Sequence, residues 1–446
     1  MRATVVGAGL AGCEAAWALA NRGVEVTLFE QKPLRRSPAH RADGFAELVC
    51  SNSLKAERVE SAAGLLKEEM SRLGSLTVAA ALSCRVPAGG ALAVDRNRFS
   101  ELVTKKILCH PNIRVVHEIC GEIPAQGVVI VATGPLTEGP LAEAIAARCG
   151  GYLSFYDAAA PIVSADSVDP SLAFSASRYG RGGADDYLNC PMDREAYEAF
   201  YEALLHAECA PLHEFDRPLT VYEGCMPVEQ LARRGKDTLR YGPLKPVGLF
   251  DPVSGRRPYA VVQLRKENEA GTMLNLVGFQ TNLKFGEQKR VFSMIPALHN
   301  ADFLRYGVMH RNSFLNSPKL LNPNYFLRDE PRIYFAGQLT GVEGYMESAG
   351  SGLIAGLSAA RRLRGLPLPP LPPETMLGAL SLHVSCGPED FQPMGANFGV
   401  LPPIEPHIRK KQERYKALAA RALRSLEEYK QNTRFDFETG PAGEIR

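Results

Sequence analysis

The chain has 446 residues, of which 45% are hydrophobic and 22% are charged, so its composition is that of a folded protein and excludes a disordered or fibrous chain. The length is three times a typical domain of ~150 residues and predicts two or three domains. Lys and Arg (51) nearly cancel Asp and Glu (49), which leaves a formal charge of +2. A uniformly basic nucleic-acid coat is therefore excluded, while a local basic face is not.

The sequence shows neither a membrane span nor a metal motif. No apolar run reaches ~18 residues, and a strand begins at once, so we expect no signal peptide and a cytoplasmic location. The ten cysteines form no C-x-x-C pair and have no zinc-ligand spacing, which predicts that no metal is bound. In a reducing compartment most of these thiols are expected to be small buried hydrophobes.

The first elements form a dinucleotide-binding signature. An apolar strand at Ala3–Val6 precedes a G-x-G-x-x-G turn, an apolar helix is expected over Cys13–Asn21, and the next strand, Val24–Phe29, ends on Glu30. The helix N-terminus then faces the phosphates of the nucleotide, and Glu30 suits the ribose hydroxyls but repels a 2′-phosphate. The sequence therefore predicts FAD or NAD, bound by Glu30 and by Gly7, Ala8, Gly9, Leu10, Ala11 and Gly12.

Each glycine of this turn has a predicted task. Gly7 permits the tight turn, Gly9 lets the pyrophosphate approach the backbone, and Gly12 lets the helix pack closely on the strand. Two later segments resemble the other nucleotide-contacting pieces of flavoproteins: a strand at 128–132, and a strand at 333–335 followed by a glycine loop and a helix over Met346–Leu363. A second glycine-rich helix entrance favours FAD over NAD. Its predicted contacts are Thr133, Gly134, Gly337, Gln338, Gly344, Tyr345 and Glu347.

These segments predict an α/β fold, with a Rossmann-like FAD-binding domain and an inserted α+β domain. We expect the first part of the FAD-binding domain at 1–155, the inserted domain at 156–300, and the second part, with a C-terminal basic helix, at 301–446. Within the insertion we expect a helix over Asp193–Glu208 and strands over Tyr259–Leu264 and Met273–Phe279. A proline-rich connector leads to an amphipathic helix over Ile408–Tyr429.

Several strings carry a family resemblance. The glycine motifs at 7–12 and 337–349 resemble flavoproteins that modify tRNA uridines, which include the wobble-uridine modification proteins. The internal strings resemble much more closely the folate- and FAD-dependent tRNA (uracil-5-)-methyltransferases of the TrmFO type. These strings span nearly the whole chain and are Glu47–Leu54, Phe155–Ala158, Tyr222–Glu229, Asp237–Val247, Gly278–Leu283 and Met309–Phe314.

The resemblance implies a methyltransferase that forms 5-methyluridine at position 54, in the T loop of tRNA. Methylenetetrahydrofolate would supply the carbon, and FADH2, regenerated by NADPH or NADH, the reducing equivalents. Carbon 5 of uracil becomes nucleophilic when a thiolate adds at carbon 6, so this chemistry needs a thiolate, a base and support for the enolate oxygen. The resemblance makes Cys50 and Cys225 the catalytic thiols. We expect Cys225 to attack uracil and Cys50 to act beside the flavin as proton acceptor or carbon carrier, although these roles could be exchanged.

Substrate contacts are predicted from residue type. His310 is a candidate to stack on the flat pterin of the folate, and Arg311, Lys284 and Arg290 are candidates for its glutamate tail. Basic clusters at 32–41, 284–290 and 409–411, the last including Arg409 and Lys410, are candidates for tRNA phosphates. No obligatory protein partner is expected. Two alternatives stay open: a plain FAD oxidoreductase, and a tRNA-binding subunit that acts only with a GTPase.

Overall fold

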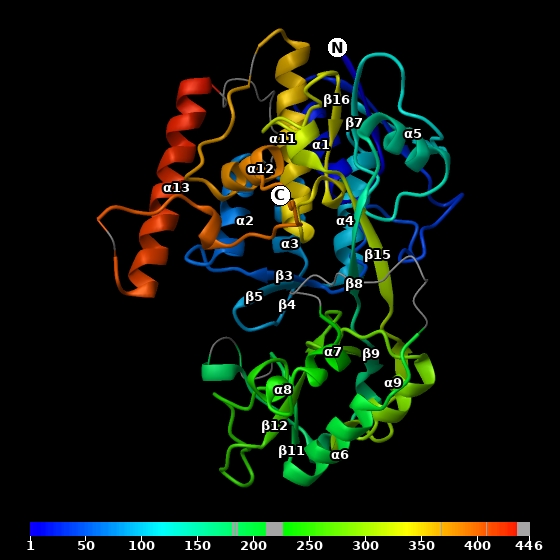
Figure 1. Cartoon of the computed structure of the whole chain (residues 1–446), viewed down its shortest axis with the longest axis vertical. Coiled ribbons are helices and arrows are strands. Elements are labelled where there is room, and N and C mark those ends of the chain that lie inside the picture. The colour runs from blue at the N-terminus through cyan, green and yellow to red at the C-terminus, as the bar shows by residue number, and fades with distance from the viewer. Residues whose placement is uncertain (181–182, 184–185, 211–225, 367, 407, 435–446) are drawn as a thin grey trace.

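The computed structural model describes residues 1–446 except 181–182, 184–185, 211–225, 367, 407 and 435–446. Two bodies lie one above the other in Figure 1, and strands β8 (Leu153–Ala158) and β15 (Met309–Phe314) run between them. The upper body combines the beginning and the end of the chain. The lower body contains its middle, so the chain crosses from one body to the other twice.

The upper body is built on a five-stranded parallel sheet. Its strand order, β16-β7-β1-β2-β6, puts the first strand in the middle, as in doubly wound nucleotide-binding folds. Most residues of the central strands are buried, because helices cover the sheet. The strands are β1 (Arg2–Val6), β2 (Glu25–Glu30), β6 (Ile113–His117), β7 (Val128–Val131) and β16 (Ile333–Phe335).

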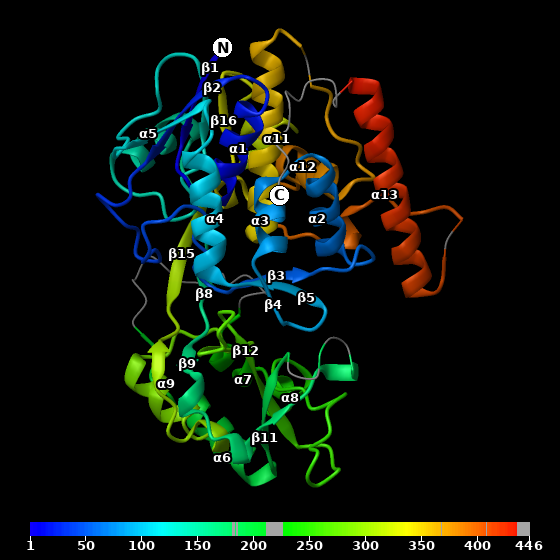
Figure 2. The same ribbon diagram turned by 180° about the vertical axis from the view of Figure 1, so that it is seen from behind.

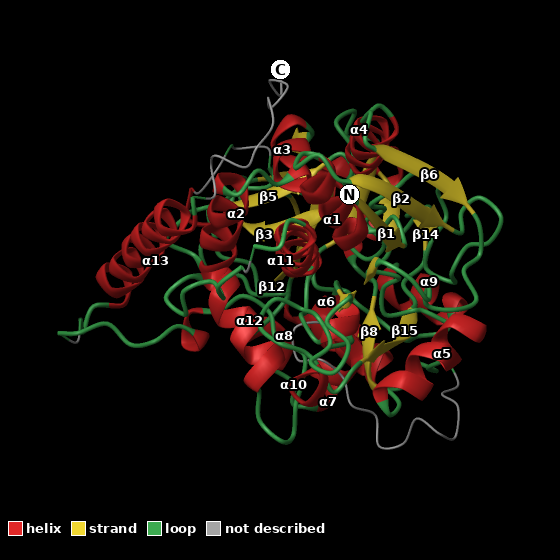
Figure 3. Cartoon of the chain, turned by 90° about the horizontal axis from the view of Figure 1, so that it is seen from above, coloured by secondary structure: helices red, strands yellow, loops and turns green. Residues whose placement is uncertain are grey.

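Two helices from opposite ends of the chain pack together on this sheet. They are α1 (Leu10–Ala20) and α11 (Tyr345–Leu363), and they lie side by side in Figure 3. Their backbones meet so closely that a Cβ atom added at Gly352 would lie 2.1 Å from the carbonyl oxygen of Ala11. This contact closes the domain around the first and last nucleotide-binding segments.

A second layer flanks these helices. Figure 2 shows α2 (Ala62–Arg72), α3 (Leu76–Ser83) and α4 (Arg96–Leu108) next to one another, above a small antiparallel sheet of order β3-β5-β4. That sheet contains β3 (Ser53–Ala56), β4 (Arg85–Val86) and β5 (Ala91–Val94). Helix α12 (Met376–Cys386) packs on α2 and α11, and α5 (Pro140–Cys149) follows β7. Helix α13 (Lys411–Thr433) covers α2 from the outside.

The lower body is an α+β domain around a six-stranded antiparallel sheet of order β10-β11-β12-β13-β9-β14. Its strands are β9 (Ile162–Ser164), β10 (Phe174–Ser175), β11 (Leu188–Met192), β12 (Ala260–Lys266), β13 (Met273–Leu276) and β14 (Phe303–Arg305). Its helices are α6 (Arg194–Leu205), α7 (Val228–Arg233), α8 (Thr238–Tyr241) and α9 (Phe285–Phe292), and the short α10 (Ser317–Leu320) begins the return to the upper body.

Two separate hydrophobic cores correspond to the two bodies. One draws its buried residues from Ala3 to Cys149 and again from Leu315 to Tyr429, and the other from Ala160 to Ala301. This confirms the predicted fold class. The predicted boundaries at 155 and 300 stay predictions, and β14 (Phe303–Arg305) still belongs to the sheet of the lower body. Predicted helix ends differ by a few residues; α1 starts at Leu10 because the last glycine of the motif is already helical. Within the described ranges, no helix combines the length and apolar character needed to cross a membrane.

Candidate active site

A cleft of about 1640 Å³, open to solvent, lies at the carboxyl ends of β1, β2 and β7. This edge of a parallel sheet is where nucleotides bind in doubly wound folds. Of the predicted cofactor contacts, the cleft is lined by Gly7, Ala8, Gly9, Leu10, Ala11, Glu30, Thr133, Gly134, Gln338, Gly337 and Tyr345. Cys50 lines the same cleft, so the structure brings one predicted catalytic thiol to the predicted cofactor site.

The glycine turn has the geometry that a pyrophosphate requires. Gly7 has φ +97°, and a Cβ atom at Gly12 would lie 1.8 Å from the carbonyl oxygen of Gly7. At Gly9 an added Cβ would meet no atom within 4 Å, so its space opens into the cleft. Gly9 is also the N-cap of α1 and offers no side-chain hydrogen bond to the helix amides. These amides therefore remain available to phosphate oxygens, and the site fits the pyrophosphate of FAD.

Glu30 is held at the end of β2 by two backbone groups. Its Oε2 accepts a hydrogen bond from Ala8 N (2.8 Å), and its Oε1 accepts one from Lys32 N (2.9 Å). Because a carboxylate oxygen can accept more than one hydrogen bond, Glu30 keeps acceptor capacity on the cleft side. Its position supports the predicted ribose contact, which stays a prediction.

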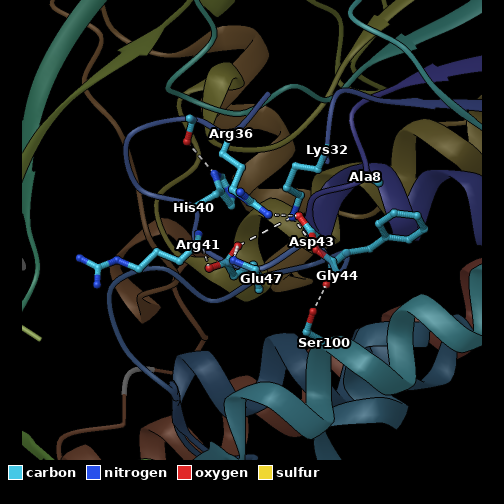
Figure 4. Close-up of polar contacts among 12 residues, drawn as sticks. Ala8, Lys32, Arg36, His40, Arg41, Asp43, Gly44, Glu47 and Ser100 are labelled. Carbon is cyan, nitrogen blue, oxygen red and sulfur yellow. Dashed lines mark hydrogen bonds and ion pairs between the residues drawn. The ribbon is translucent and has the colours of Figure 1, made fainter. Parts of the chain in front are cut away.

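The loop after Glu30 folds back over the cleft (Figure 4). Lys32 is buried, and its Nζ donates a hydrogen bond to the carbonyl oxygen of Gly44. The same Nζ lies 3.8 Å from the carboxylate of Glu47. Arg36 forms an ion pair with Asp43 in the same loop. Burial and the nearby Lys32 lower the pKa of His40. Lys32 is therefore withdrawn from any RNA surface, and of the labelled cations the exposed Arg41 points away from the cluster.

The predicted second helix entrance is present at α11, but its acidic residue faces elsewhere. Glu347 is buried; its Oε1 accepts hydrogen bonds from Lys55 Nζ (2.7 Å) and from Ala396 N (3.0 Å). Neither Glu347 nor Gly344 is among the residues that line the cleft. Gly337, in contrast, lines it at the end of β16, and its N–H donates to Ser351 Oγ on α11 (2.7 Å). A cofactor contact by Glu347 stays a prediction.

Cys50, a predicted catalytic thiol, is in direct contact with Tyr345, a predicted cofactor contact. The Tyr345 hydroxyl oxygen lies 2.9 Å from Cys50 Sγ and accepts hydrogen bonds from Cys50 N (2.8 Å) and Ser51 N (3.2 Å). Burial raises the pKa of Tyr345 well above its ordinary value. The first residue of α11 thus fixes the loop that carries the thiol, over a separation of 295 residues.

Several other thiols lie in surroundings that make them unreactive. Burial raises the pKa of Cys120 and of Cys149 to about 11, and that of Cys190 to about 12. It also raises the pKa of the fully buried Cys13. Since the thiolate is the nucleophile, the raised pKa makes each of these four cysteines a poorer nucleophile. Cys225 lies outside the described residues, so its proximity to Cys50 stays a prediction.

The predicted substrate contacts fall into three groups. Lys284 is the N-cap of α9 and forms an ion pair with Glu208 (2.5 Å). Arg290 lies in α9 and forms an ion pair with Glu287 (2.6 Å). Arg409 and Lys410 precede α13 and are exposed, with Lys410 Nζ 3.1 Å from Glu413. None of these four lines the cleft. For His310 and Arg311 only the backbone, in β15, is described; Asn312 of that strand reaches the cleft.

A group of arginines beneath the Cys50 loop was not predicted from the sequence. Arg96 donates to Leu48 O (2.6 Å) and Arg305 to Val49 O, while Arg265 donates to Ser51 Oγ (3.0 Å). Arg265 and Arg305 come from the inserted domain, more than 200 residues away. An arginine inside an otherwise apolar strand, as in β12, was the available signal, because such a charge is buried only when it has a partner.

Comparison with known proteins decides the family. A sequence profile described as glucose inhibited division protein A matches residues 2–367. The methylenetetrahydrofolate–tRNA-(uracil-5-)-methyltransferase TrmFO of Acetivibrio thermocellus is 57% identical over 427 residues, which are 95% of this chain and 98% of that protein. The chain belongs to the TrmFO family. The TrmFO of Pelobacter propionicus is 59% identical over 425 residues, 95% of this chain and 93% of that protein. The family predicted from the motifs is confirmed.

A solved structure agrees with the fold. One crystal form of Aquifex aeolicus GidA superposes with a TM-score of 0.67 at 16% identity, over 98% of this chain and 78% of that one. At this identity the likeness concerns the fold alone. It confirms the predicted fold class, a dinucleotide-binding domain interrupted by an inserted domain, which this chain shares with that protein.

Proposed function

We propose that this chain transfers the methylene carbon of methylenetetrahydrofolate to carbon 5 of a tRNA uridine and reduces it to a methyl group. The product is 5-methyluridine at position 54, in the T loop. This activity is the one that names its TrmFO relatives. One observation of the site carries the proposal: a thiol, Cys50, lies at the dinucleotide cleft in contact with the first residue of the second helix entrance.

FAD is the cofactor that fits the cleft. The open space at Gly9, the uncapped amides of α1 and the carboxylate of Glu30 would hold its pyrophosphate and ribose. Bound there, FAD supplies the reducing equivalents that turn a methylene into a methyl group, and NADPH or NADH restores them. Because tRNA and folate meet in the cytoplasm, we expect the chain to act there, without an obligatory protein partner.

The chain's own residues supply the nucleophile and its surroundings. In this proposal Cys225 adds to carbon 6 of uracil, and Cys50 acts beside the cofactor as proton acceptor or carbon carrier; the exchange of these roles is the alternative. Tyr345 positions Cys50 through its hydroxyl. Exposed cations such as Arg409 and Lys410 would contact tRNA phosphates, with Lys284, Arg290, His310 and Arg311 proposed for folate.

The deciding experiment is a methylation assay of the purified chain. Unmodified tRNA transcript, NADPH and methylenetetrahydrofolate labelled in its methylene carbon are expected to give labelled 5-methyluridine, whereas labelled S-adenosylmethionine gives none. Oxidation of NADPH by the flavin-bound chain without label in tRNA from either donor would contradict the proposal and favour a plain oxidoreductase. Label that appears only with an added partner protein would favour an assembly subunit.

Single substitutions assign the thiols. Cys50→Ala and Cys225→Ala are each expected to abolish methylation while FAD is retained. Cys109→Ala and Cys386→Ala serve as matched controls, since both thiols are exposed and neither lines the cleft. The variant that still forms a covalent adduct with 5-fluorouridine-containing tRNA retains the nucleophile. An adduct in Cys225→Ala but not in Cys50→Ala would exchange the two roles.

A further inference from the structure

Three arginines hold Leu48, Val49 and Ser51, which flank Cys50. Arg265 is buried, whereas Arg96 and Arg305 are half-buried. Arg96 on α4 binds the carbonyl of Leu48, Arg305 on β14 binds that of Val49, and Arg265 on β12 binds Ser51 Oγ. Arg96 belongs to the dinucleotide domain, whereas the other two belong to the inserted domain. The loop around the thiol is therefore placed by both domains together.

Arg305 reaches this loop because its strand is irregular. Strand β14 pairs with β9 through Phe303 with Val163 and Arg305 with Ile162, and the register shifts between these two pairs. A bulge of this kind turns a side chain out of the regular alternation, and such bulges are frequent beside active sites. Here it directs a cation from the edge of the inserted sheet to the backbone next to Cys50.

The three arginines carry more positive charge than their carboxylate neighbours offset. In the part of the chain that the structure describes, Glu267 is the acid that forms an ion pair within this group, with Arg96 at 2.7 Å. The Nε atoms of Arg96 and Arg305 have no acceptor among the described residues. Burial and the adjacent Arg96 lower the pKa of Arg305. Since a buried unpaired charge is costly, a further negative charge is needed nearby.

The hydrogen bonds around Tyr345 favour Cys50 as the site of that charge. The Tyr345 oxygen accepts two backbone N–H groups, so both of its lone pairs are used. Its own proton is left to donate to Cys50 Sγ, 2.9 Å away, and Tyr345 keeps that proton because burial raises its pKa. The Cys50 sulfur thus accepts this bond, and a thiolate accepts such a bond more strongly than a thiol does.

We propose that Arg305 is a positioning residue which, with Arg96, holds Cys50 as a thiolate once the inserted domain is seated on the dinucleotide domain. Other titratable groups also line the cleft, and Arg41 adds a further cation near Arg305. The other groups that line it are Glu30, Lys32, Arg35, His40, Glu47, Glu118, Cys120 and Glu138. A thiolate reacts where a thiol does not. The use of the Cys50 thiolate in methyl transfer rests on the proposed function, whereas the presence of this thiolate in the folded chain does not.

The test measures the alkylation of Cys50 by iodoacetamide as a function of pH, in the FAD-bound chain without tRNA or folate. Peptide mass spectrometry separates Cys50 from the other thiols. Loss of one nearby cation in Arg305→Gln is expected to raise the pH midpoint by about one unit and to slow alkylation at pH 7 about tenfold. Arg305→Lys, which keeps the charge, is expected to stay close to the wild type.

Arg98→Gln is the matched control, because it removes an exposed arginine of the same helix as Arg96, and its midpoint should not move. An unchanged midpoint in Arg305→Gln, or the same shift in Arg305→Lys, would overturn the proposal. If Arg305→Gln loses its FAD, Tyr345→Phe replaces it: removal of the O–H donor should also raise the midpoint, and no shift would overturn the assignment of the charge. A chain with a normal midpoint but no methylation would contradict only the proposed function.

Discussion

The N-termini of α1 and α12 present the same physical problem and solve it in opposite ways. At α12, Thr375 caps the Gly378 amide (3.0 Å), and the buried carboxylate of Glu69 on α2 accepts the amides of Met376 (2.8 Å) and Leu377 (2.9 Å). At α1 the N-cap is Gly9, which has no side chain, and the first turn contains no acidic residue. One helix end is closed by protein groups, and the other is left open at the cleft.

The entrance of α3 is also closed by protein groups, as that of α12 is. There Ser75 is the N-cap, and Glu14, which projects from α1, accepts hydrogen bonds from Thr77 N (2.8 Å) and Thr77 Oγ1 (2.5 Å). Helix N-termini attract anions because their amides are unpaired and the helix dipole is positive there. The difference between α12 and α1 teaches that an anion at the open end of α1 must come from a ligand.

The strongest test converts the open end into a closed one. Gly9 has φ −72°, which any residue adopts, and a Cβ atom there meets nothing. Gly9→Asp should therefore fold and cap α1 with its own carboxylate, which repels the pyrophosphate. We expect FAD affinity to fall about 100-fold or more, measured by flavin absorbance after dialysis and by calorimetric titration of the stripped chain.

Two variants separate charge from bulk in this prediction. Gly9→Ala adds the Cβ alone, and Gly9→Asn adds the same shape as Asp without the charge, so FAD should bind to both more tightly than to Gly9→Asp. The stripped Gly9→Asp chain should also be slightly more stable than the stripped wild type, by a few tenths of a kcal/mol, because Asp is a better N-cap than Gly. Undiminished FAD affinity in Gly9→Asp would mean that the phosphates do not bind at this helix end.

The reverse test opens a closed end. Glu69→Ala leaves the buried amides of Met376 and Leu377 without an acceptor, and we expect a loss of about 3 kcal/mol in the free energy of unfolding. Glu69→Gln keeps one acceptor oxygen and should lose about half as much. Urea unfolding of the FAD-bound chain at fixed FAD concentration measures both. Equal stability of Glu69→Ala and the wild type would show that this carboxylate does not support α12.

The closed end also predicts a pH dependence. Burial raises the pKa of Glu69 to about 8, although the two amides favour the charged form. Between the unfolded value of about 4.5 and 8, the folded chain holds a proton that the unfolded chain releases. Stability from this group is therefore complete below pH 4.5 and is lost as the pH rises toward 8, by up to about 1.4 kcal/mol per unit. The advantage of the wild type over Glu69→Gln should shrink between pH 5 and 8; an advantage that grows would contradict the raised pKa.

The open end was predictable from sequence, whereas the closed ends were not. A turn such as 7–12 encodes its own geometry locally, because only glycine tolerates φ +97° at Gly7 and the close approach at Gly12. The helix after it was expected to be apolar, and Glu14 was passed over. A carboxylate inside such a helix needs a buried partner, but sequence does not say which helix end supplies it.

The residues of the candidate site also divide into those that the sequence predicted and those that it did not. Cys50 and Tyr345 were predicted from family strings, each as a member of a separate motif, and their contact joins residues 295 positions apart. The arginines beneath Cys50 were not predicted, since Arg305 reaches Val49 only through a strand irregularity and the seating of the inserted domain. Local backbone requirements leave a trace in sequence. Contacts made by the docking of one domain on another do not.

The smallest expected effects concern the two side chains that cap α12 and α2, Thr375 and Ser61. Thr375 at α12 is fully buried and Ser61 at α2 is partly exposed, yet both accept the third amide of their helix, from Gly378 (3.0 Å) and Gly64 (3.2 Å). Thr375→Ala should cost about 1 kcal/mol of unfolding free energy, and Ser61→Ala about half of that because water replaces its hydroxyl. Equal losses in urea unfolding would mean that burial does not add to the cost of opening a helix end. In that case an uncapped helix end would cost the same whether buried or exposed, and the open end of α1 would not by itself indicate a ligand.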